Sequence, residues 1–285
     1  MHSEAFHSLP RFRLFSVALL LSVAAWARAD DLAPPPPTDF RLSATGGFLY
    51  GPAKGFVQVP SGGQPGSTSH NRPRLGEIGI DSASIGTIAI SGTWDAHEAF
   101  VGAEIIRLGG TGTLPHDLIT HGTRFAPGTR VTSDVSLDWY RIGYRHHFSF
   151  DAGANGIPQF SLAPYADVVM WNFDYRLRGG GASTSRGYLK PTVQGGVQAG
   201  WRPGGGPFSL DVDLSASPPG VSSLPFIAAE HVTASYRFPV STTASLVARA
   251  GVRFEQMNYF DNQRVPNHTR ADLGPLLIVG FGVEF

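Results

Sequence analysis

Apolar and polar residues alternate along most of this 285-residue chain, and this two-residue period limits its possible folds more than any other feature. The pattern is clearest at the C-terminus, where the chain ends in LLIVGFGVEF. Apolar side chains occupy every second position there: Leu277, Val279, Phe281, Val283 and Phe285. Because successive side chains of a β-strand point to opposite faces, this run predicts a strand whose apolar face reaches the last residue.

Similar alternating segments recur between connections rich in Gly, Pro, Asn and Asp, and signals for helices are almost absent. The connections are long after odd-numbered strands and short after even-numbered ones. The alternation predicts about ten strands, in a range of about eight to twelve, at residues 39–50, 74–94, 98–108, 131–150, 159–177, 188–201, 208–216, 227–238, 244–259 and 274–285.

The N-terminus has the pattern of an export signal. Arg11 and Arg13 precede an apolar run of about a dozen residues, and Ala27 and Ala29 form a small-x-small cleavage site. This run is shorter than the roughly 20 residues that a membrane helix needs. We therefore expect a signal peptide over residues 1–29, cleaved after Ala29, then a Pro-rich spacer over residues 30–38 and one β-domain over residues 39–285.

The composition is unusual for a water-soluble protein. Only 15% of the residues are charged, against roughly 25% in typical soluble domains, and 35 residues are Gly. This low charge suggests that a large surface faces something other than water. A formal net charge of zero argues against a nucleic-acid partner, and the lack of Cys excludes disulfides and thiolate chemistry.

One parity of each predicted strand is apolar and the other is polar. In the second strand, for example, the apolar parity comprises Ile78, Ile80, Ile88, Ile90 and Trp94. In a membrane barrel the apolar parity faces lipid and the polar parity faces the lumen. The residues expected to face the lumen are Glu77, Asp81, Glu104, Arg141, Arg145, Asp167, Lys190, Asp211, Asp213, Arg237, Arg249, Arg253 and Glu255.

The aromatic residues are concentrated near the two ends of the strands, as in the aromatic girdles of membrane barrels. At the short-turn ends they are Phe40, Trp94, Phe148, Phe150, Phe160, Trp201, Phe208, Phe238 and Phe285. At the long-loop ends they are Tyr50, Trp139, Tyr140, Trp171, Phe173, Tyr175, Tyr188, Phe254 and Tyr259. We expect these two sets to mark two membrane interfaces.

Two segments change their apolar parity part-way along. The apolar residues have odd numbers at Leu137 and Trp139 but even numbers at Ile142 and Tyr144. The predicted fifth strand has a similar change. These changes lie about ten residues from the short turns, roughly one membrane crossing for a tilted strand. They indicate either a β-bulge or a protrusion of this hairpin beyond the membrane.

Together these features predict an all-β, up-and-down antiparallel transmembrane barrel. The export signal, the alternating strands and the terminal Phe285 resemble Gram-negative outer-membrane β-barrel proteins. In that family, alternate apolar residues that end in an aromatic form an assembly signal, which corresponds here to Leu277, Val279, Phe281, Val283 and Phe285. The resemblance implies an outer-membrane location, contact with membrane lipid and lipopolysaccharide, and recognition by the barrel-assembly machinery.

Three functions are compatible with such a barrel, and a structural or surface-interaction role is favoured. About ten strands give a narrow lumen, which mixed charges can fill as an ion-pair network. The alternative is a narrow channel or a site for a small polar or anionic ligand. The predicted inward positions of Gly143, Gly196, Gly200, Gly251, Gly280 and Gly282 would leave space for it.

The third possibility is an outer-membrane enzyme, but we expect no catalytic activity. His147 and Ser149 weakly resemble the His-x-Ser of lipid A deacylases, although they lie near a short turn. Asp134, Asp138, Asp174 and His268 lie towards the opposite end, as acidic and His residues do in omptin proteases, but without an omptin motif. No cofactor is expected. His116 and His121 have no evident third metal ligand, so no metal site is expected either.

Overall fold

The computed structural model describes residues 40–58, 73–120, 122–152, 158–219, 221, 223–261 and 267–285. The predicted signal peptide and Pro-rich spacer lie outside the described residues. Among the residues described, no helix is long and apolar enough to span a membrane.

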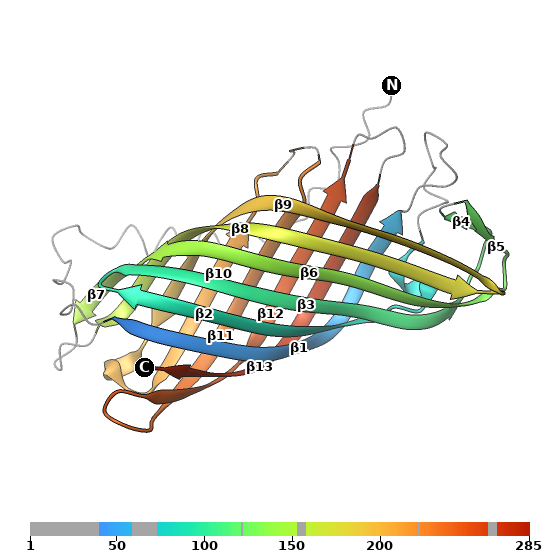
Figure 1. Cartoon of the computed structure of the whole chain (residues 1–285). Coiled ribbons are helices and arrows are strands. Elements are labelled where there is room, and N and C mark those ends of the chain that lie inside the picture. The colour runs from blue at the N-terminus through green and yellow to red at the C-terminus, as the bar shows by residue number, and fades with distance from the viewer. Residues whose placement is uncertain are drawn as a thin grey trace.

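Ten antiparallel strands form a closed barrel, which confirms the predicted fold class (Figure 1). They are β1 (Arg41–Gln58), β2 (Ser82–Trp94), β3 (His97–Thr113), β6 (Arg130–His146), β8 (Pro158–Gly179), β9 (Ala182–Trp201), β10 (Phe208–Ala216), β11 (Phe226–Pro239), β12 (Ser245–Phe260) and β13 (His268–Glu284). Each strand pairs with its neighbours in the chain, β1 pairs with β13, and β7 (Phe148–Ala152) continues the line of β6 beside β8.

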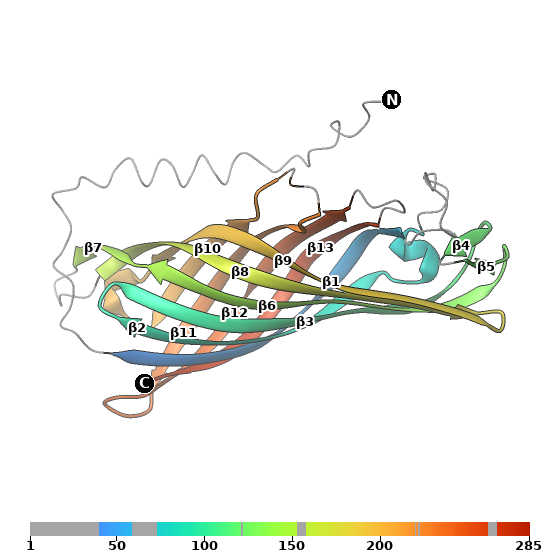
Figure 2. The same cartoon turned by 45° about the horizontal axis from the view of Figure 1, so that its top comes forward.

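The remaining elements are short. A 3-10 helix, η3 (Leu75–Ile78), precedes β2, a second one, η4 (Pro203–Gly205), follows β9, and β4 (Leu118–Thr120) pairs with β5 (Thr123–Phe125). Figure 2 shows the β4–β5 hairpin at the end of the barrel towards which β3, β6, β8 and β9 extend furthest. We call this end the long-loop end, and the opposite one the short-turn end.

Two predicted boundaries are wrong in an informative way. The second strand begins at Ser82, because residues 75–78 form η3, so Ile78 and Ile80 are fully buried rather than lipid-facing. The third predicted long loop is a tight turn at Gly180 and Gly181, both with positive φ. Strands β8 and β9 therefore form one long hairpin.

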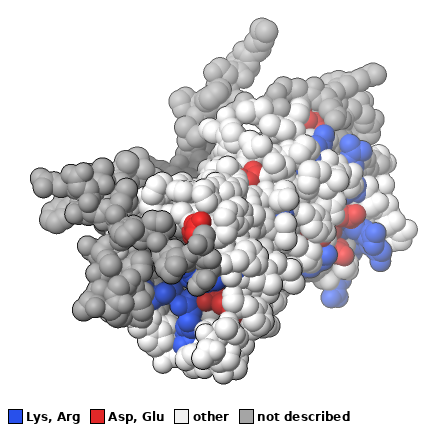
Figure 3. Space-filling view, turned by 60° about the vertical axis from the view of Figure 1, so that its left-hand side comes forward, with Lys and Arg blue, Asp and Glu red and all other residues white. Residues whose placement is uncertain are grey.

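The outward surface of the barrel is apolar along a continuous band. The outward positions of β13 carry Leu277, Val279 and Phe281, which are 65%, 69% and 74% exposed. Figure 3 shows a broad uncharged surface, with most of the charged side chains of that face gathered towards its ends. Seven of the nine aromatic residues predicted for the first girdle are exposed at the short-turn end, and Phe148 and Phe150 are half-buried. The exposed seven are Phe40, Trp94, Phe160, Trp201, Phe208, Phe238 and Phe285.

The second girdle is smaller than predicted. Tyr50, Tyr140 and Phe254 are exposed on the outer face. Most of the other predicted members are buried on the inward parity: Trp139, Trp171, Phe173, Tyr175 and Tyr259. They fill the lumen instead of contacting lipid, because the inward parity itself becomes apolar towards the long-loop end.

The same change explains the two parity switches, and no β-bulge is involved. The register between β6 and β8 is unbroken from Val131 opposite Gly179 to Arg145 opposite Tyr165. Odd residues point inward throughout, so Leu137 faces the lumen just as Arg141 does. Outward residues are apolar up to Tyr140 on β6 but polar beyond it, as at Ser136 and Asp134. Strands β6 and β8 therefore extend past the apolar band, where water surrounds their outer face and an apolar core packs against their inner face.

That core is completed by elements that fold over the barrel end. Leu75 and Ile78 of η3 and Leu118 and Phe125 of the β4–β5 hairpin are all buried, and they join the apolar inward residues of β1, β2, β3, β6 and β8. Each largely buried Leu, Ile or Phe side chain contributes about 1.5–3 kcal/mol relative to exposure. The long-loop end of the lumen is thus packed like the interior of a globular domain.

Candidate functional site

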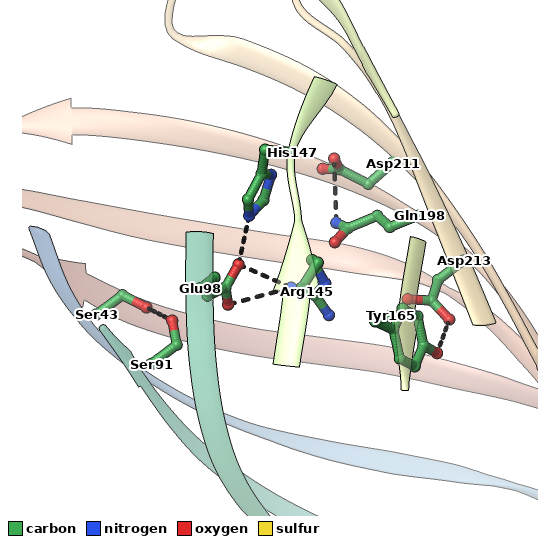
Figure 4. Close-up of polar contacts among 9 residues, drawn as sticks. All are labelled: Ser43, Ser91, Glu98, Arg145, His147, Tyr165, Gln198, Asp211 and Asp213. Carbon is green, nitrogen blue, oxygen red and sulfur yellow. Dashed lines mark hydrogen bonds and ion pairs between the residues drawn. The ribbon is translucent and has the colours of Figure 1, made fainter. Parts of the chain in front are cut away.

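The lumen near the short-turn end contains a cluster around the carboxylate of Glu98 (Figure 4). Arg145 Nη1 lies 3.2 Å from Glu98 Oε1, and His147 Nε2 lies 2.7 Å from Glu98 Oε2. Glu98 comes from the start of β3, Arg145 from β6 and His147 from the residue between β6 and β7. Their register brings them together, since Arg145 is the direct partner of Glu98 across the two strands. One carboxylate is therefore shared by two cationic or hydrogen-bonding groups.

Aromatic rings occupy the space next to this cluster. The Arg145 guanidinium lies 5.2 Å from the ring centre of Phe100 and 5.1 Å from that of Tyr165. The Tyr165 hydroxyl donates a hydrogen bond of 2.8 Å to Asp213 Oδ1 (Figure 4). Cation–π contacts of this kind are stronger when desolvated, and here both rings are nearly inaccessible to solvent.

The same rings fill the space that inward glycines were expected to leave open. A Cβ atom on Gly143 would lie 2.4 Å from Phe100 Cζ, and one on Gly196 would lie 2.3 Å from Tyr165 Cζ. These glycines allow bulky rings to pack against the wall. They do not open a passage at this level of the lumen, contrary to that expectation.

A second cluster lies deeper in the lumen and consists of two arginines and three carboxylates. Arg141 lies 2.7 Å from Asp167 and 3.6 Å from Glu104. Arg253 lies 2.9 Å from Glu104 and 2.8 Å from Glu255. Glu104 thus bridges the two arginines from opposite sides of the barrel. All five side chains have at most 22% of their surface exposed, so each charge depends on its partners for compensation.

A layer of aromatic side chains covers the second cluster on the side of the long-loop end. Arg253 lies 5.8 Å from the ring centre of Trp139. Beyond it, the ring centres of Trp171 and Tyr259 are 5.3 Å apart, and those of Tyr188 and Tyr259 are 5.0 Å apart. Such spacings are typical of packed aromatic pairs. The layer separates the charged part of the lumen from the apolar core above it.

The other predicted lumen residues occupy separate places. Lys190 lies 5.8 Å from the ring centre of Tyr259, and Arg237 binds Glu284 at 2.6 Å. Asp211 lies 3.5 Å from Gln198 Nε2, and Arg249 has the inward parity of β12. Glu77 belongs to η3 and Asp81 precedes β2, so neither is on a barrel strand as predicted.

Three residues at the centre of these contacts were missing from the predicted set: Glu98, His147 and Tyr165. Strand parity could have identified them, because Glu98 has the parity of Glu104 and His147 has that of Arg145. Tyr165 likewise has the parity of Asp167.

The three acidic candidates lie together on the outward face of β6 and β8, because Asp174 is the cross-strand partner of Ser136, between Asp134 and Asp138. Asp138 also binds Arg107 and accepts a hydrogen bond from the backbone N–H of Ile106. His268 of β13 packs against Phe56 of β1 and Phe260 of β12. Three strands lie between β13 and β6 around the wall, so His268 is remote from the acidic residues. Within the described ranges, no group of three or more His, Asp and Glu side chains could hold a metal ion, and His121 lies outside them.

A closed barrel of antiparallel strands, apolar and aromatic outside and charged inside, is decisive for the structural class. The chain has the architecture of a transmembrane β-barrel. No protein-family model and no curated protein matches its sequence.

Solved structures that match this chain include three that align over most of its length at low sequence identity. A Pseudomonas aeruginosa FadL homologue aligns over 87% of this chain and 90% of its own, with 11% identity and a TM-score of 0.30. The transport unit of the autotransporter AIDA-I from Escherichia coli aligns over 95% and 97%, with 10% identity and a TM-score of 0.37. The outer membrane protease OmpT from Escherichia coli aligns over 90% and 99%, with 10% identity and a TM-score of 0.25.

Proposed function

We propose that this protein is an integral outer-membrane barrel with a closed lumen, and that it acts through its external surface in a structural or surface-interaction role. The observation that carries the proposal is the order of the layers along the inside of the barrel. The ion-paired cluster around Glu104 is followed by the aromatic layer of Trp171 and Tyr259 and then by an apolar core. Dehydrated apolar packing of this kind opposes the passage of ions, because ions lose their hydration without compensation.

Several features support an outer-membrane location. The outward apolar band matches the lipid-facing surface of bacterial barrels, and such barrels place short turns in the periplasm and longer loops outside. The predicted export signal and the terminal Phe285 are consistent with assembly there by the barrel-assembly machinery. In this orientation the lipid-facing band contacts phospholipid on the periplasmic side and lipopolysaccharide on the outer side.

The ends of β6 and β8 that project beyond the apolar band offer the surface for an interaction outside the cell. Their outward residues beyond the apolar band are polar or charged, and they include Asp134, Asp174, Arg176 and Arg178. Their inward face is buried under η3 and the β4–β5 hairpin. A wall that is supported from inside and charged outside is suited to present a fixed surface to a partner.

The proposal includes no catalytic role. The Nε2 atom of His147 contacts Glu98, which also binds Arg145, so the imidazole is part of a charge cluster. We expect cells that overproduce the protein to show no change in the mass of lipid A. A deacylated or otherwise modified lipid A would contradict this part of the proposal.

Conductance in planar bilayers tests the closed lumen directly. We expect no stepwise ion current from the wild-type barrel. The combined variant Trp139→Ala, Trp171→Ala and Tyr259→Ala removes the aromatic layer and should produce discrete conductance steps. Phe254→Ala, which truncates an exposed ring on the outer face, is the matched control and should stay silent. Stepwise current from the wild-type protein would refute the closed barrel and favour the narrow-channel alternative.

A further inference from the structure

Strand β9 has one backbone edge that is open beyond the end of β10. It pairs with β8 over residues 182–201 but with β10 only over residues 195–201. In Figure 1, β8 and β9 run side by side to the right-hand end of the view. No other described strand pairs with residues 182–194, and within the described part of the chain these residues form no backbone hydrogen bond apart from those with β8. This open edge, residues 182–194 of β9, is a template for pairing with a further chain.

The register shows which backbone groups face the open edge. The N–H of Arg202 donates to the carbonyl of Gln159 of β8, and the β8–β9 register continues from there without a shift. Successive residues of a strand direct their N–H and C=O groups to opposite sides, so the even-numbered residues of β9 bond to β8. The odd-numbered residues therefore face the open edge, namely Ser183, Ser185, Gly187, Leu189, Pro191 and Val193.

Pro191 marks the place where the open edge leaves the apolar band. It is the cross-strand partner of Met170, which is the partner of Tyr140, and the outward face of the wall is apolar up to that level. Pro191 faces the open edge but has no N–H, so it leaves no unpaired donor beside lipid. Beyond it, from Leu189 to Ser183, the edge continues past the band with its N–H groups in place. The part of the edge that can pair with a partner is therefore the part that lies in water.

Two cations project from the inner face of this segment without a carboxylate partner. Arg186 and Lys190 have inward parity, and no ion pair links either one to a described residue. The Nε atom of Arg186 is buried and forms no hydrogen bond with a described residue, and the Nζ atom of Lys190 lies 5.8 Å from the ring centre of Tyr259. The carboxylate of Asp261, which follows β12, accepts hydrogen bonds from Tyr259 and Asn267 instead. The inner face beside the open edge is therefore positively charged.

We propose that the open edge of β9 binds an extended acidic peptide segment of another protein as an additional strand. The backbone of the segment pairs with the edge from Ser183 to Leu189, in the manner of β-strand addition. Directly opposite side chains of an antiparallel pair point to the same face. Carboxylates four residues apart on the bound segment therefore lie opposite Arg186 and Lys190, which are also four residues apart. Such docking is one form of the surface-interaction role proposed above, and it rests on that role.

The same charges disfavour the two occupants that this chain could supply. Pairing of β9 with a second copy of itself would gather Arg186 and Lys190 of both copies on one face, where like charges repel. The segments outside the described residues that connect β1 to η3 and β12 to β13, 59–72 and 262–266, contain no Asp or Glu. A partner with its own carboxylates complements the edge better than either.

Fluorescence anisotropy with labelled peptides tests the proposal on the purified, folded barrel in detergent micelles. The probe TTETTTETT carries its two glutamates four residues apart, and TTKTTTKTT replaces them by lysines. A third peptide, TTEPTTETT, keeps the charges but loses one backbone N–H that faces β9 in the matching register. We expect saturable binding of the first peptide and at least about tenfold weaker binding of each of the others, as the loss of two charge pairs or of backbone pairing produces.

Two variants of the barrel separate backbone pairing from charge. Ser185→Pro removes an N–H from the open edge and should weaken binding of the acidic peptide about tenfold, whereas Ser185→Ala keeps this donor and should bind as wild type does. Arg186→Gln combined with Lys190→Gln should weaken binding by a similar factor. Its matched control is Lys54→Gln combined with Arg130→Gln, which removes an exposed lysine and an exposed arginine at the same end of the barrel. Heat-modifiable migration on gels verifies that every variant is folded.

Disulfide formation in a glutathione redox buffer locates the bound strand. The chain has no Cys, so Ser185→Cys introduces a single thiol at the open edge, and Thr132→Cys introduces one on β6, which is paired on both sides. The peptide TTETTTECT places its cysteine opposite Ser185 when its glutamates lie opposite Arg186 and Lys190. We expect it to crosslink to the Ser185→Cys variant and not to the Thr132→Cys variant.

Equal binding of the acidic and basic peptides, or a Ser185→Pro variant that binds as Ser185→Ala does, would overturn the proposal. Equal crosslinking of the two cysteine variants, or a double variant of Arg186 and Lys190 that matches its control, would overturn it as well. These outcomes leave the closed lumen untouched, because a failure of the closed lumen is seen as stepwise current from the wild-type barrel and not in peptide binding.

Discussion

Arg253 is the residue whose loss should reveal how much the lumen network contributes to stability. Its guanidinium binds Glu104 at 2.9 Å and Glu255 at 2.8 Å, and its side chain is 9% exposed. In Arg253→Met the chain keeps a similar length, but two buried carboxylates lose their shared counter-ion. Breaking a buried ion pair from one side costs about 3–5 kcal/mol, because the remaining charge is neither hydrated nor paired.

Two effects set the expected loss near the middle of that range. Arg253 serves two carboxylates, which raises the cost of its removal. Glu104 keeps a longer contact of 3.6 Å to Arg141, which limits the effect at that residue. Urea unfolding in lipid vesicles, followed by tryptophan fluorescence, measures the free energy of unfolding. We expect Arg253→Met to lower it by about 4 kcal/mol.

Two controls separate charge from packing. The combined variant Glu104→Gln, Arg253→Met and Glu255→Gln removes the whole charged unit and should be within about 1.5 kcal/mol of wild type, since buried ion pairs contribute little net stability. Arg237→Met breaks a pair with Glu284 in which both side chains are about one-third exposed, and it should cost at most about 1 kcal/mol. The reasoning fails if Arg253→Met costs less than Arg237→Met, or if the neutral variant is less stable than the single one.

Two further predictions concern packing and assembly. Gly196→Val should lower the free energy of unfolding by about 1–3 kcal/mol, because its side chain would displace the ring of Tyr165, whereas Gly86→Ala has open space and should be nearly neutral in the same urea titration. Deletion of Phe285 removes two backbone hydrogen bonds to Leu42, of 2.8 and 3.1 Å, together with an exposed aromatic ring. We expect less heat-modifiable protein in outer-membrane fractions, and an unchanged amount would argue against an assembly role for this residue.

The parity argument correctly identified faces but not always the medium that each face contacts. Ile142 and Leu137 are both apolar, yet one faces outward and the other faces the lumen. Alternation states only which residues share a face. Beyond the apolar band, water surrounds the wall and the interior takes the role of an ordinary core, so the expected polarity of the two sides is exchanged. This exchange explains why Trp139, Trp171 and Tyr175 were assigned to a girdle.

The sequence predicted which charged residues point into the lumen but not which of them contact one another. Inward charges such as Arg141, Arg253 and Glu104 follow from strand parity alone. Parity does not indicate that Glu104 of β3 meets Arg253 of β12, because the two strands are far apart in the sheet order and meet only across the lumen. It also does not indicate that the ring of Phe100 fills the space beside Gly143.

By itself, the sequence determined about ten strands, the two faces of each strand and the apolar band, because these depend on local alternation and on turn residues. Closure of the barrel and the pairing of charges across it were decided only by the tertiary structure. The physical reason is that these features depend on register and on side chains brought together from distant strands. Local propensity contains no information about such contacts, whereas packing and electrostatic compensation inside a closed wall select one arrangement.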